Sequence, residues 1–451
     1  MSSKEQYVAA IDIGTTKIVA IVGRKNENGK IEILGLSKAL SKGVKRGVVM
    51  NIEETVNAIQ TTVEDVQKRS GIMFSEVFVG IAGQHIKSMK NRGYILRDSY
   101  EDEIRKEEVF RLIEDMHKIH IDIGEEIIHV IPQNFIVDNE TGVKSPIGMC
   151  GRRLEANFHI VIGQVAAAKN IEKCIRKVNL SVKDMILEPL ASSDAVLTDD
   201  EKEAGVALVD IGGGTTDLAV YYDNIIRHTA VIPLGGNVVT KDIKEGCAIL
   251  QRHAEQLKIQ YGSALGDIAP EDKVVSIPGI SGREPKEISF RSLAYIIQSR
   301  MEEIIDFVNF EIQNSGYADK LAAGVVITGG GAMLKHLPQL MKFKTAMDVR
   351  IGLPNEHLTG VGRDEINQPM YATAVGLVMR GFEYLEMYKK SFSAGRKEVY
   401  VTPPVRERID HDEAEPKETE EQYQPEPKTS LTEKIKIMMM KMFEVEDQPI
   451  N

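Results

Sequence analysis

A short pattern that occurs once in each half of the sequence constrains the fold more than any other feature. Residues 8–22 and 206–220 both contain an apolar run, then Asp-Ile-Gly, a Thr-Thr pair and a second apolar run. Such runs are typical of buried strands, so each pattern predicts two strands joined by a glycine turn. Glycines let successive backbone amides close on an anion. The sequence therefore predicts two related α/β domains, each with a phosphate-binding hairpin.

The alternative for either turn alone is a glycine-rich β-hairpin without a ligand, because a short glycine pattern is weak evidence by itself. The duplication favours a clamp that holds a nucleotide between two domains. Asp210, at the end of a strand, can hold a hydrated Mg²⁺, and the first turn likewise follows an aspartate, Asp12. A third turn, residues 329–331, precedes a helix and is expected to pack against a base or ribose. Glu255 and Lys258 share one face of a predicted helix, where the alternative is a solvated ion pair.

Composition restricts the class of protein. The 451 residues are 42% hydrophobic and 27% charged, which is typical of a soluble globular chain of about three domains. The net charge of −11 argues against a general nucleic-acid-binding role. The three cysteines match no zinc or redox spacing and favour a reducing compartment. Without an apolar signal segment or a run of about 18 apolar residues, the protein is expected in the cytoplasm unless its C-terminus attaches it elsewhere.

The order of predicted strands and helices divides the chain into two halves with additions. Strands alternate with helices in both halves, as in α/β sheets, and a more charged α+β segment interrupts the first half. The predicted boundaries place the first domain at 1–83 and 163–204, its insert at 84–162, the sheet of the second domain at 205–240 and 316–390, and its mostly helical part at 241–315.

The C-terminal region differs in composition from the rest. Residues 391–430 hold 5 prolines, 10 acidic and 6 basic residues, and are expected to form a disordered linker. The last segment, 431–451, then begins with an apolar stripe at helical spacing, made of Leu431, Ile435, Met438, Met439 and Met442 and followed by Phe443. Flanking lysines favour a helix in a membrane interface, and the alternative is docking on the protein's own body or on a partner. Because residues 431–443 carry a net charge of only +2, binding is expected to need the avidity of a polymer.

Taken in order, these motifs resemble those of the actin, hexokinase and Hsp70-type ATPase superfamily. The turns at 12–17 and 210–217 are similar to its two phosphate motifs, and residues 327–334 are similar to its adenosine motif. Residues 188–196 and 371–377 resemble its two connecting helices. Within the superfamily the chain resembles the FtsA family of bacterial cell division proteins, on segments 41–47, 79–83, 188–193 and 233–236 and on Thr240 and Asp242.

The resemblance implies duplicated ribonuclease-H-type domains, 1A and 2A, around a nucleotide cleft, with subdomain 1C as the insert and subdomain 2B at 241–315. It implies ATP and Mg²⁺ as ligands, with Asp12 and Asp210 contacting the metal through water. The nucleotide contacts that it implies are Gly14, Thr15, Thr16, Lys17, Gly213, Gly214, Thr215, Thr216, Gly236, Asn237, Glu255, Lys258, Gly330, Gly331 and Met333. Glu188 lies where relatives place a polar residue that orients the attacking water. At most slow ATP hydrolysis is expected, because the sequence offers no dedicated strong base.

The resemblance also implies partners. A docking face for the C-terminal peptide of the tubulin-like protein FtsZ is expected between residues 279 and 303, and ordinary solvated charge is the alternative for its basic candidates Arg283, Lys286, Arg291 and Arg300. The implied function is a polymer, assembled partly through subdomain 1C, that anchors the FtsZ ring to the cytoplasmic face of the cell membrane at the septum and recruits later division membrane proteins. Other functions on this fold are a pilus-assembly-type adaptor, a peptide-binding chaperone and a small-molecule kinase. The kinase would need a base for a substrate hydroxyl, and the sequence identifies none.

Overall fold

A computed structural model describes residues 6–26, 29–279, 284–354, 358–359 and 363–394 of the chain. The chain up to Phe382 forms one compact unit, and the residues from Glu383 onward form a second, of which the structure describes only the end of one helix. Three predictions concern residues outside these ranges: Arg283, the linker beyond residue 394 and the segment 431–451. Among the described helices, none has the length and apolar character needed to cross a membrane.

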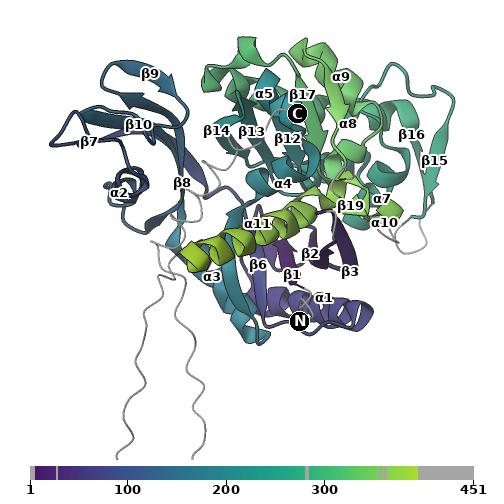
Figure 1. Cartoon of the computed structure of the whole chain (residues 1–451). Coiled ribbons are helices and arrows are strands. Elements are labelled where there is room, and N and C mark those ends of the chain that lie inside the picture. Colours follow the sequence, from purple (N-terminus) through teal and green to yellow (C-terminus); the bar gives the residue numbers. More distant parts are fainter. Residues whose placement is uncertain (1–5, 27–28, 280–283, 355–357, 360–362, 395–451) are drawn as a thin grey trace, which may run out of the picture. The chain divides into compact units, whose positions relative to one another are not determined.

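The first half of the chain builds a six-stranded sheet in the order β11-β6-β1-β2-β3-β19 (Figure 1). Its strands are β1 (Tyr7–Ile13), β2 (Lys17–Lys25), β3 (Ile31–Leu40), β6 (Glu76–Ile81), β11 (Ser181–Leu187) and β19 (Leu358–Thr359). Strands β1, β2 and β3 pair antiparallel, whereas β6 is parallel to β1 and β11 is parallel to β6. A small hairpin of β4 (Val44–Lys45) and β5 (Val48–Val49) follows β3.

Two helices accompany this sheet. Helix α1 (Ile52–Ser70) contacts β2 and β3, and α3 (Val165–Lys177) contacts both α1 and β11. The side chain of Asn51 caps the start of α1 by accepting a hydrogen bond from the Glu54 amide at 3.2 Å. Helix α1 ends at Gly71, whose φ of 69° lies in the left-handed region that glycine favours.

The second half repeats this sheet. Five strands lie in the order β14-β13-β12-β17-β18, namely β12 (Val206–Ile211), β13 (Thr216–Tyr222), β14 (Ile225–Ile232), β17 (Val325–Thr328) and β18 (Val349–Ile351). Strands β12, β13 and β14 pair antiparallel like β1, β2 and β3. Strands β17 and β18 extend the sheet in parallel, as β6 and β11 do in the first half. The predicted duplication of α/β domains is therefore confirmed.

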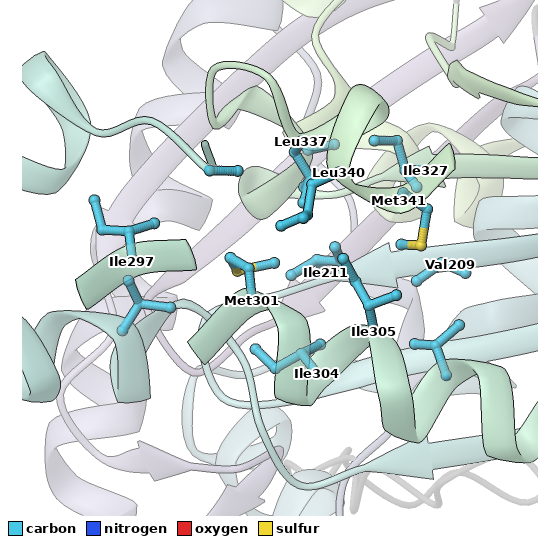
Figure 2. Packing of buried hydrophobic residues seen from close by; sticks show 14 of the residues in the cluster. Val209, Ile211, Ile297, Met301, Ile304, Ile305, Ile327, Leu337, Leu340 and Met341 are labelled. Carbon is cyan, nitrogen blue, oxygen red and sulfur yellow. The ribbon is translucent and has the colours of Figure 1, made fainter. Parts of the chain in front are cut away.

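Helices cover the second sheet and form its core. Side chains of α8 (Phe290–Ser315) and α9 (Leu337–Thr345) meet β12 and β17 in a cluster of buried residues; Figure 2 labels Val209, Ile211, Ile297, Met301, Ile304, Ile305, Ile327, Leu337, Leu340 and Met341. The rest of this half comprises α6 (Gly236–Cys247), α7 (Gln251–Tyr261), the pair β15 (Val274–Ile277) and β16 (Lys286–Ser289), α10 (Arg363–Ile366), and 3-10 helices at Ala318–Lys320, Gly330–Met333 and Pro369–Tyr371.

The segment between β6 and α3 is the small α+β subdomain that the sequence predicts (Figure 1). Its strands, in the order β7-β10-β8-β9, are β7 (Lys87–Leu96), β8 (Glu125–Val137), β9 (Glu140–Val143) and β10 (Arg153–Gln164). Helix α2 (Lys106–Met116) contacts β7 and β8. Gly93 allows this close packing, because a Cβ atom there would lie 2.7 Å from Met116 Cε.

Two further helices lie close to the sheets and contact each other. Helix α4 (Glu188–Val196) follows β11 directly, and α5 (Asp199–Ala204) leads from α4 to β12. Helix α11 spans Ala372–Ala394, so its last four residues, 391–394, fall within the predicted linker. Helices α4 and α11 cross in backbone contact, because a Cβ atom at Gly376 would lie 1.8 Å from the Ala191 carbonyl oxygen.

Candidate nucleotide site

The structure brings the two repeated glycine turns face to face. The first turn (residues 14–16) joins β1 to β2, and the second turn (residues 212–215) joins β12 to β13. A Cβ atom at Gly213 would lie 2.2 Å from Thr16 Cγ2, and one at Gly214 would lie 2.4 Å from Thr15 Oγ1. Only glycine fits at these two positions, so the turns can approach closely enough to contact one small anionic group from both sides.

Backbone hydrogen bonds fix the shape of the second turn. The Gly212 amide donates to the Thr215 carbonyl at 2.9 Å, and the Gly236 amide donates to the Gly212 carbonyl at 2.9 Å. The fully buried Thr216 hydroxyl donates to the Leu234 carbonyl at 2.9 Å. The hydroxyl of Thr216 therefore stabilises the turn, although the resemblance implies that this residue is a phosphate contact.

The start of α6 belongs to the same group of residues. The Asn237 amide donates to the Gly213 carbonyl at 2.8 Å, which places Gly236 and Asn237 beside the second turn. Helix N-termini favour anions because their first amides have no partner within the helix. The predicted contacts Gly213, Gly236 and Asn237 therefore lie together, and the first two amides of α6 are used to hold the second turn.

Four carboxylates gather behind the turns and repel one another. Burial, with the neighbouring charge of Asp210 opposed by Lys17, raises the pKa of Asp12 to about 6. Burial and the charges of Asp12, Asp217 and Asp210 raise the pKa of Glu188 well above its ordinary value. Burial, followed by the charge of Asp210, raises the pKa of Asp217 to about 8. A cation in this cluster would relieve both the repulsion and the loss of hydration.

The carboxylate cluster suits a hydrated metal ion. Asp217 Oδ1 is buried without a hydrogen-bond partner among the described residues, so the cluster holds an acceptor that a ligand could satisfy. Within the described ranges, no three His, Cys, Asp or Glu side chains are placed to bind a metal directly. The donor set therefore fits a Mg²⁺ ion that keeps its water and contacts Asp12 and Asp210 through it.

Asp210 also contacts residues that sequence reasoning did not assign to the site. Its Oδ2 accepts hydrogen bonds from the hydroxyls of Ser192 on α4 at 2.7 Å and Thr373 on α11 at 3.3 Å. The third turn lies on its other side, because a Cβ atom at Gly329 would lie 2.2 Å from Asp210 Oδ1. Ser192 and Thr373 both fall within the segments that resemble connecting helices, and that position was the only signal available.

Glu255 and Lys258, which the resemblance implies are nucleotide contacts, belong to a compact group of hydrogen-bonded polar side chains. Lys258 Nζ donates to the Gly236 carbonyl at 3.0 Å and to the Thr240 hydroxyl at 2.8 Å, and it pairs with Glu255 at 2.8 Å. The Thr240 hydroxyl in turn donates to Glu255. The predicted Glu255–Lys258 pair is thus hydrogen-bonded to the start of α6. The structure is compatible with a role of this pair in nucleotide binding and with an ion pair that has no ligand.

The 3-10 helix Gly330–Met333 offers the surface that the adenosine prediction requires. A Cβ atom at Gly330 would meet no atom within 4 Å, and Met333 is 52% exposed. Gly331, by contrast, packs against Ile211, where a Cβ atom would lie 2.3 Å from Ile211 Cγ2. The third turn is therefore held on β12 by Gly331 while Gly330 and Met333 stay open to a ligand.

Two of the predicted partner-binding residues, Arg291 and Arg300, are already paired within the chain. Arg300 donates to Asp242 at 3.1 Å and also pairs with Glu303, and Arg291 pairs with Glu271. Lys286 is exposed on β16. An acidic peptide would have to compete with these acidic side chains for the two arginines.

Comparison with known proteins supplies the family. The model of the family described as "Cell division protein FtsA" matches residues 207–376, and that described as "SHS2 domain inserted in FTSA" matches residues 83–162. The FtsA protein of Pseudomonas aeruginosa (strain PAO1) is 41% identical over 379 residues, covering 84% of this chain and 90% of the relative. The FtsA protein of Escherichia coli (strain K12) is 35% identical over 389 residues, covering 85% and 92% respectively.

Solved structures agree on the fold. A type IV pilus biogenesis complex of PilM and PilN superposes with a TM-score of 0.61 at 14% identity, covering 83% of this chain and 98% of the other. MreB5 of Spiroplasma citri bound to AMPPNP superposes with a TM-score of 0.52 at 15% identity, covering 87% of this chain and all of the other. The fold is therefore actin-like with an SHS2 insertion, and the chain belongs to the FtsA family of cell division proteins.

Proposed function

We propose that this member of a cell division family is an ATP-binding actin homologue that polymerises and anchors the FtsZ ring to the cytoplasmic face of the membrane. One observation carries the nucleotide part of the proposal: two glycine turns from separate sheets meet beside a cluster of buried carboxylates. Family membership supports the role in division. The membrane and FtsZ parts rest on the C-terminal stripe and on the basic residues near β16.

In this proposal the chain's own residues bind and orient the nucleotide. Amides of the first and second turns would hold the phosphates, the start of α6 would support the second turn, and Lys17 would balance the phosphate charge. Gly330 and Met333 would contact the adenosine. Magnesium would supply charge neutralisation between the phosphates, with Asp12 and Asp210 holding its water.

Hydrolysis is expected to be slow at most, because the sequence offers no dedicated strong base and Glu188 is only the residue that the resemblance implies would orient the attacking water. Burial and the charges of Asp12, Asp217 and Asp210 raise the pKa of Glu188 well above its ordinary value, which favours its protonated form until a cation relieves the cluster. A protonated carboxyl group is a poor general base. Bound ATP would then govern the arrangement of the two halves and self-assembly more than it drives chemistry on another molecule.

Two other functions receive less support. A small-molecule kinase would need a base beside a substrate hydroxyl. The buried carboxylates of the candidate site lie instead at the phosphate turns. A pilus-assembly-type adaptor shares the fold, but the relatives of high identity are cell division proteins. The partners in this proposal remain the FtsZ C-terminal peptide, further copies of the chain through subdomain 1C, later division membrane proteins and lipid.

A matched pair of substitutions tests membrane anchoring. Met442 lies in the apolar stripe at 431–443, whereas Met440 falls on the opposite side of the same helical wheel. Met442→Glu should abolish sedimentation with anionic lipid vesicles in the presence of ATP, and Met440→Glu should leave it unchanged. FtsZ should sediment with vesicles only when the anchor does. Equal vesicle binding by both variants would reject the anchor, whether or not the protein binds ATP.

A further inference from the structure

Asp210 is held by hydroxyl groups from two helices that are far apart in the sequence. Ser192 Oγ on α4 and Thr373 Oγ1 on α11 both donate to Asp210 Oδ2, at 2.7 and 3.3 Å. The two hydroxyl oxygens are themselves 3.0 Å apart. All three side chains are buried, and Asp210 is 9% exposed. Three elements thus converge on one carboxylate oxygen, which fixes its position more tightly than β12 alone would.

The hydroxyl pair lies at the place where the two helices cross. The backbone of Gly376 lies against the backbone of Ala191, the residue before Ser192. Gly376 is about one helical turn beyond Thr373. Because the helices touch through backbone at this point, the crossing cannot slide without moving both hydroxyls. A change in the crossing would therefore change the position of Asp210 Oδ2.

The other carboxylate oxygen is confined as well. A Cβ atom at Gly329 would lie 2.2 Å from Asp210 Oδ1, so the third turn packs directly on this oxygen. Ser192 and Thr373 on one side and Gly329 on the other fix the rotation of the carboxylate. The charge of Lys17 lowers the pKa of Asp210, and the charge of Asp210 raises the pKa of Asp12, so these two residues lie within electrostatic reach of the carboxylate.

We propose that Ser192 and Thr373 are positioning residues that orient the Asp210 carboxylate toward magnesium-bound nucleotide and make that orientation depend on the crossing of α4 and α11. The inference rests on the proposed nucleotide site and adds two residues to it. Hydrogen-bond partners behind a metal-side carboxylate commonly decide its orientation and its affinity for the metal complex. The coupling would also act in the opposite direction. A Mg²⁺–nucleotide complex that interacts with Asp210 would favour one arrangement of the crossing between α4 and α11.

The test removes each hydroxyl with little change in volume. We expect Thr373→Val and Ser192→Ala to weaken ATP binding about 10- to 100-fold with Mg²⁺ and less than about twofold in EDTA. Thr373→Ser keeps the hydroxyl and should restore binding. Because both hydroxyls share one acceptor oxygen, the double variant should lose less affinity than the product of the two single losses. Ser193→Ala is the matched control, since Ser193 donates to the Pro189 carbonyl within α4 at 2.6 Å.

A spectroscopic readout separates positioning from packing. With Mn²⁺ in place of Mg²⁺, the electron paramagnetic resonance spectrum of the bound Mn²⁺–ATP complex should change in Thr373→Val and revert in Thr373→Ser. Equal losses with and without metal, or an unchanged spectrum, would overturn the inference. Failure of the unmodified protein to bind ATP at all would instead reject the proposed nucleotide site. If Ser192→Ala does not fold, the Thr373→Val and Thr373→Ser pair makes the same comparison.

Discussion

At the scale of single residues, the candidate site gathers more negative charge than the unliganded protein can stabilise. Asp12, Glu188, Asp210 and Asp217 all have raised pKa values, and burial is the largest cause for each. Lys17 is the cation that opposes the increase for three of them. Such a cluster costs stability when its members ionise, which is common at functional sites and unusual in a core that serves only packing.

This charge gives the unliganded protein a defined pH dependence. The pKa of Asp217 rises from 3.8 to about 8, so the folded protein keeps a proton that the unfolded chain releases. The contribution of Asp217 to stability is therefore fully present below its unfolded pKa and is lost as the pH rises through its folded pKa, whereas the lowered pKa of buried His159 acts in the opposite direction. Between about pH 5 and pH 8 the Asp217 contribution to the free energy of unfolding should fall by up to about 4 kcal/mol, and Asp217→Asn should remove this contribution from the pH dependence.

Urea unfolding at the two pH values measures the effect on wild type and variant. Asp319→Asn, at an exposed carboxylate on a 3-10 helix, should leave the pH dependence unchanged. An identical slope in wild type and Asp217→Asn would show that Asp217 is ionised throughout the range.

The glycines of the turns differ in what a methyl group would meet. Gly213→Ala would place Cβ 2.2 Å from Thr16 Cγ2 and force the first and second turns apart. We expect it to lower the free energy of unfolding by about 1–3 kcal/mol. Gly330→Ala meets open space and should leave the unliganded protein as stable as wild type, while weakening adenosine binding. Thermal melts without nucleotide distinguish the two, and equal losses would contradict the close approach of the turns.

At the scale of elements, sequence patterns predict the parts that rest on local chemistry. The repeated turn predicts both sheets, since each needs only a buried strand, a glycine turn and a second strand. A change in charge and in hydrophobic periodicity along the sequence predicts the α+β insert. The hydrogen bonds of Asp210 with Ser192 and Thr373 could not be predicted, because they join residues 18 and 163 positions away through no periodic pattern. The internal pairing of Arg300 with Asp242, 58 positions away, was missed for the same reason.

The crossing of α4 and α11 gives a prediction opposite to helix propensity. Replacing a glycine inside a helix by alanine normally stabilises a protein by about 0.5–1 kcal/mol. At Gly376 the added Cβ would lie 1.8 Å from the Ala191 carbonyl oxygen, so Gly376→Ala should destabilise the protein by about 3 kcal/mol or more. Gly246→Ala in α6 is the control, because its Cβ would meet only the flexible end of Ile296, at 2.9 Å. Urea unfolding compares them, and a stabilised Gly376→Ala would contradict the backbone contact.

At the scale of the whole molecule, the insert connects the two sheets. Both of its ends continue into the first half, through β6 and α3, yet its polar side chains bond to the second sheet. Ser88 Oγ donates to the Thr229 carbonyl at 2.8 Å, and Gln133 Nε2 donates to the Ile226 carbonyl at 2.9 Å. These contacts occupy the edge strand β14, which would otherwise present unpaired backbone groups. A shift between the two halves would therefore be transmitted to the insert.

One buried contact allows this connection to be tested. His159 Nε2 and Thr229 Oγ1 are 2.8 Å apart, both side chains are buried, and burial lowers the pKa of His159 to about 3, so the ring is neutral. Thr229→Val keeps the shape but leaves a buried ring nitrogen without its partner, which should cost about 1–3 kcal/mol. Because the contact joins the insert to β14, amide hydrogen exchange should accelerate in both β10 and β14 and stay unchanged in β1 and β2. Thr61→Val, which removes an exposed hydroxyl that bonds within α1, is the control. Faster exchange confined to β14 would mean that the insert is held by its other contacts and moves independently of Thr229.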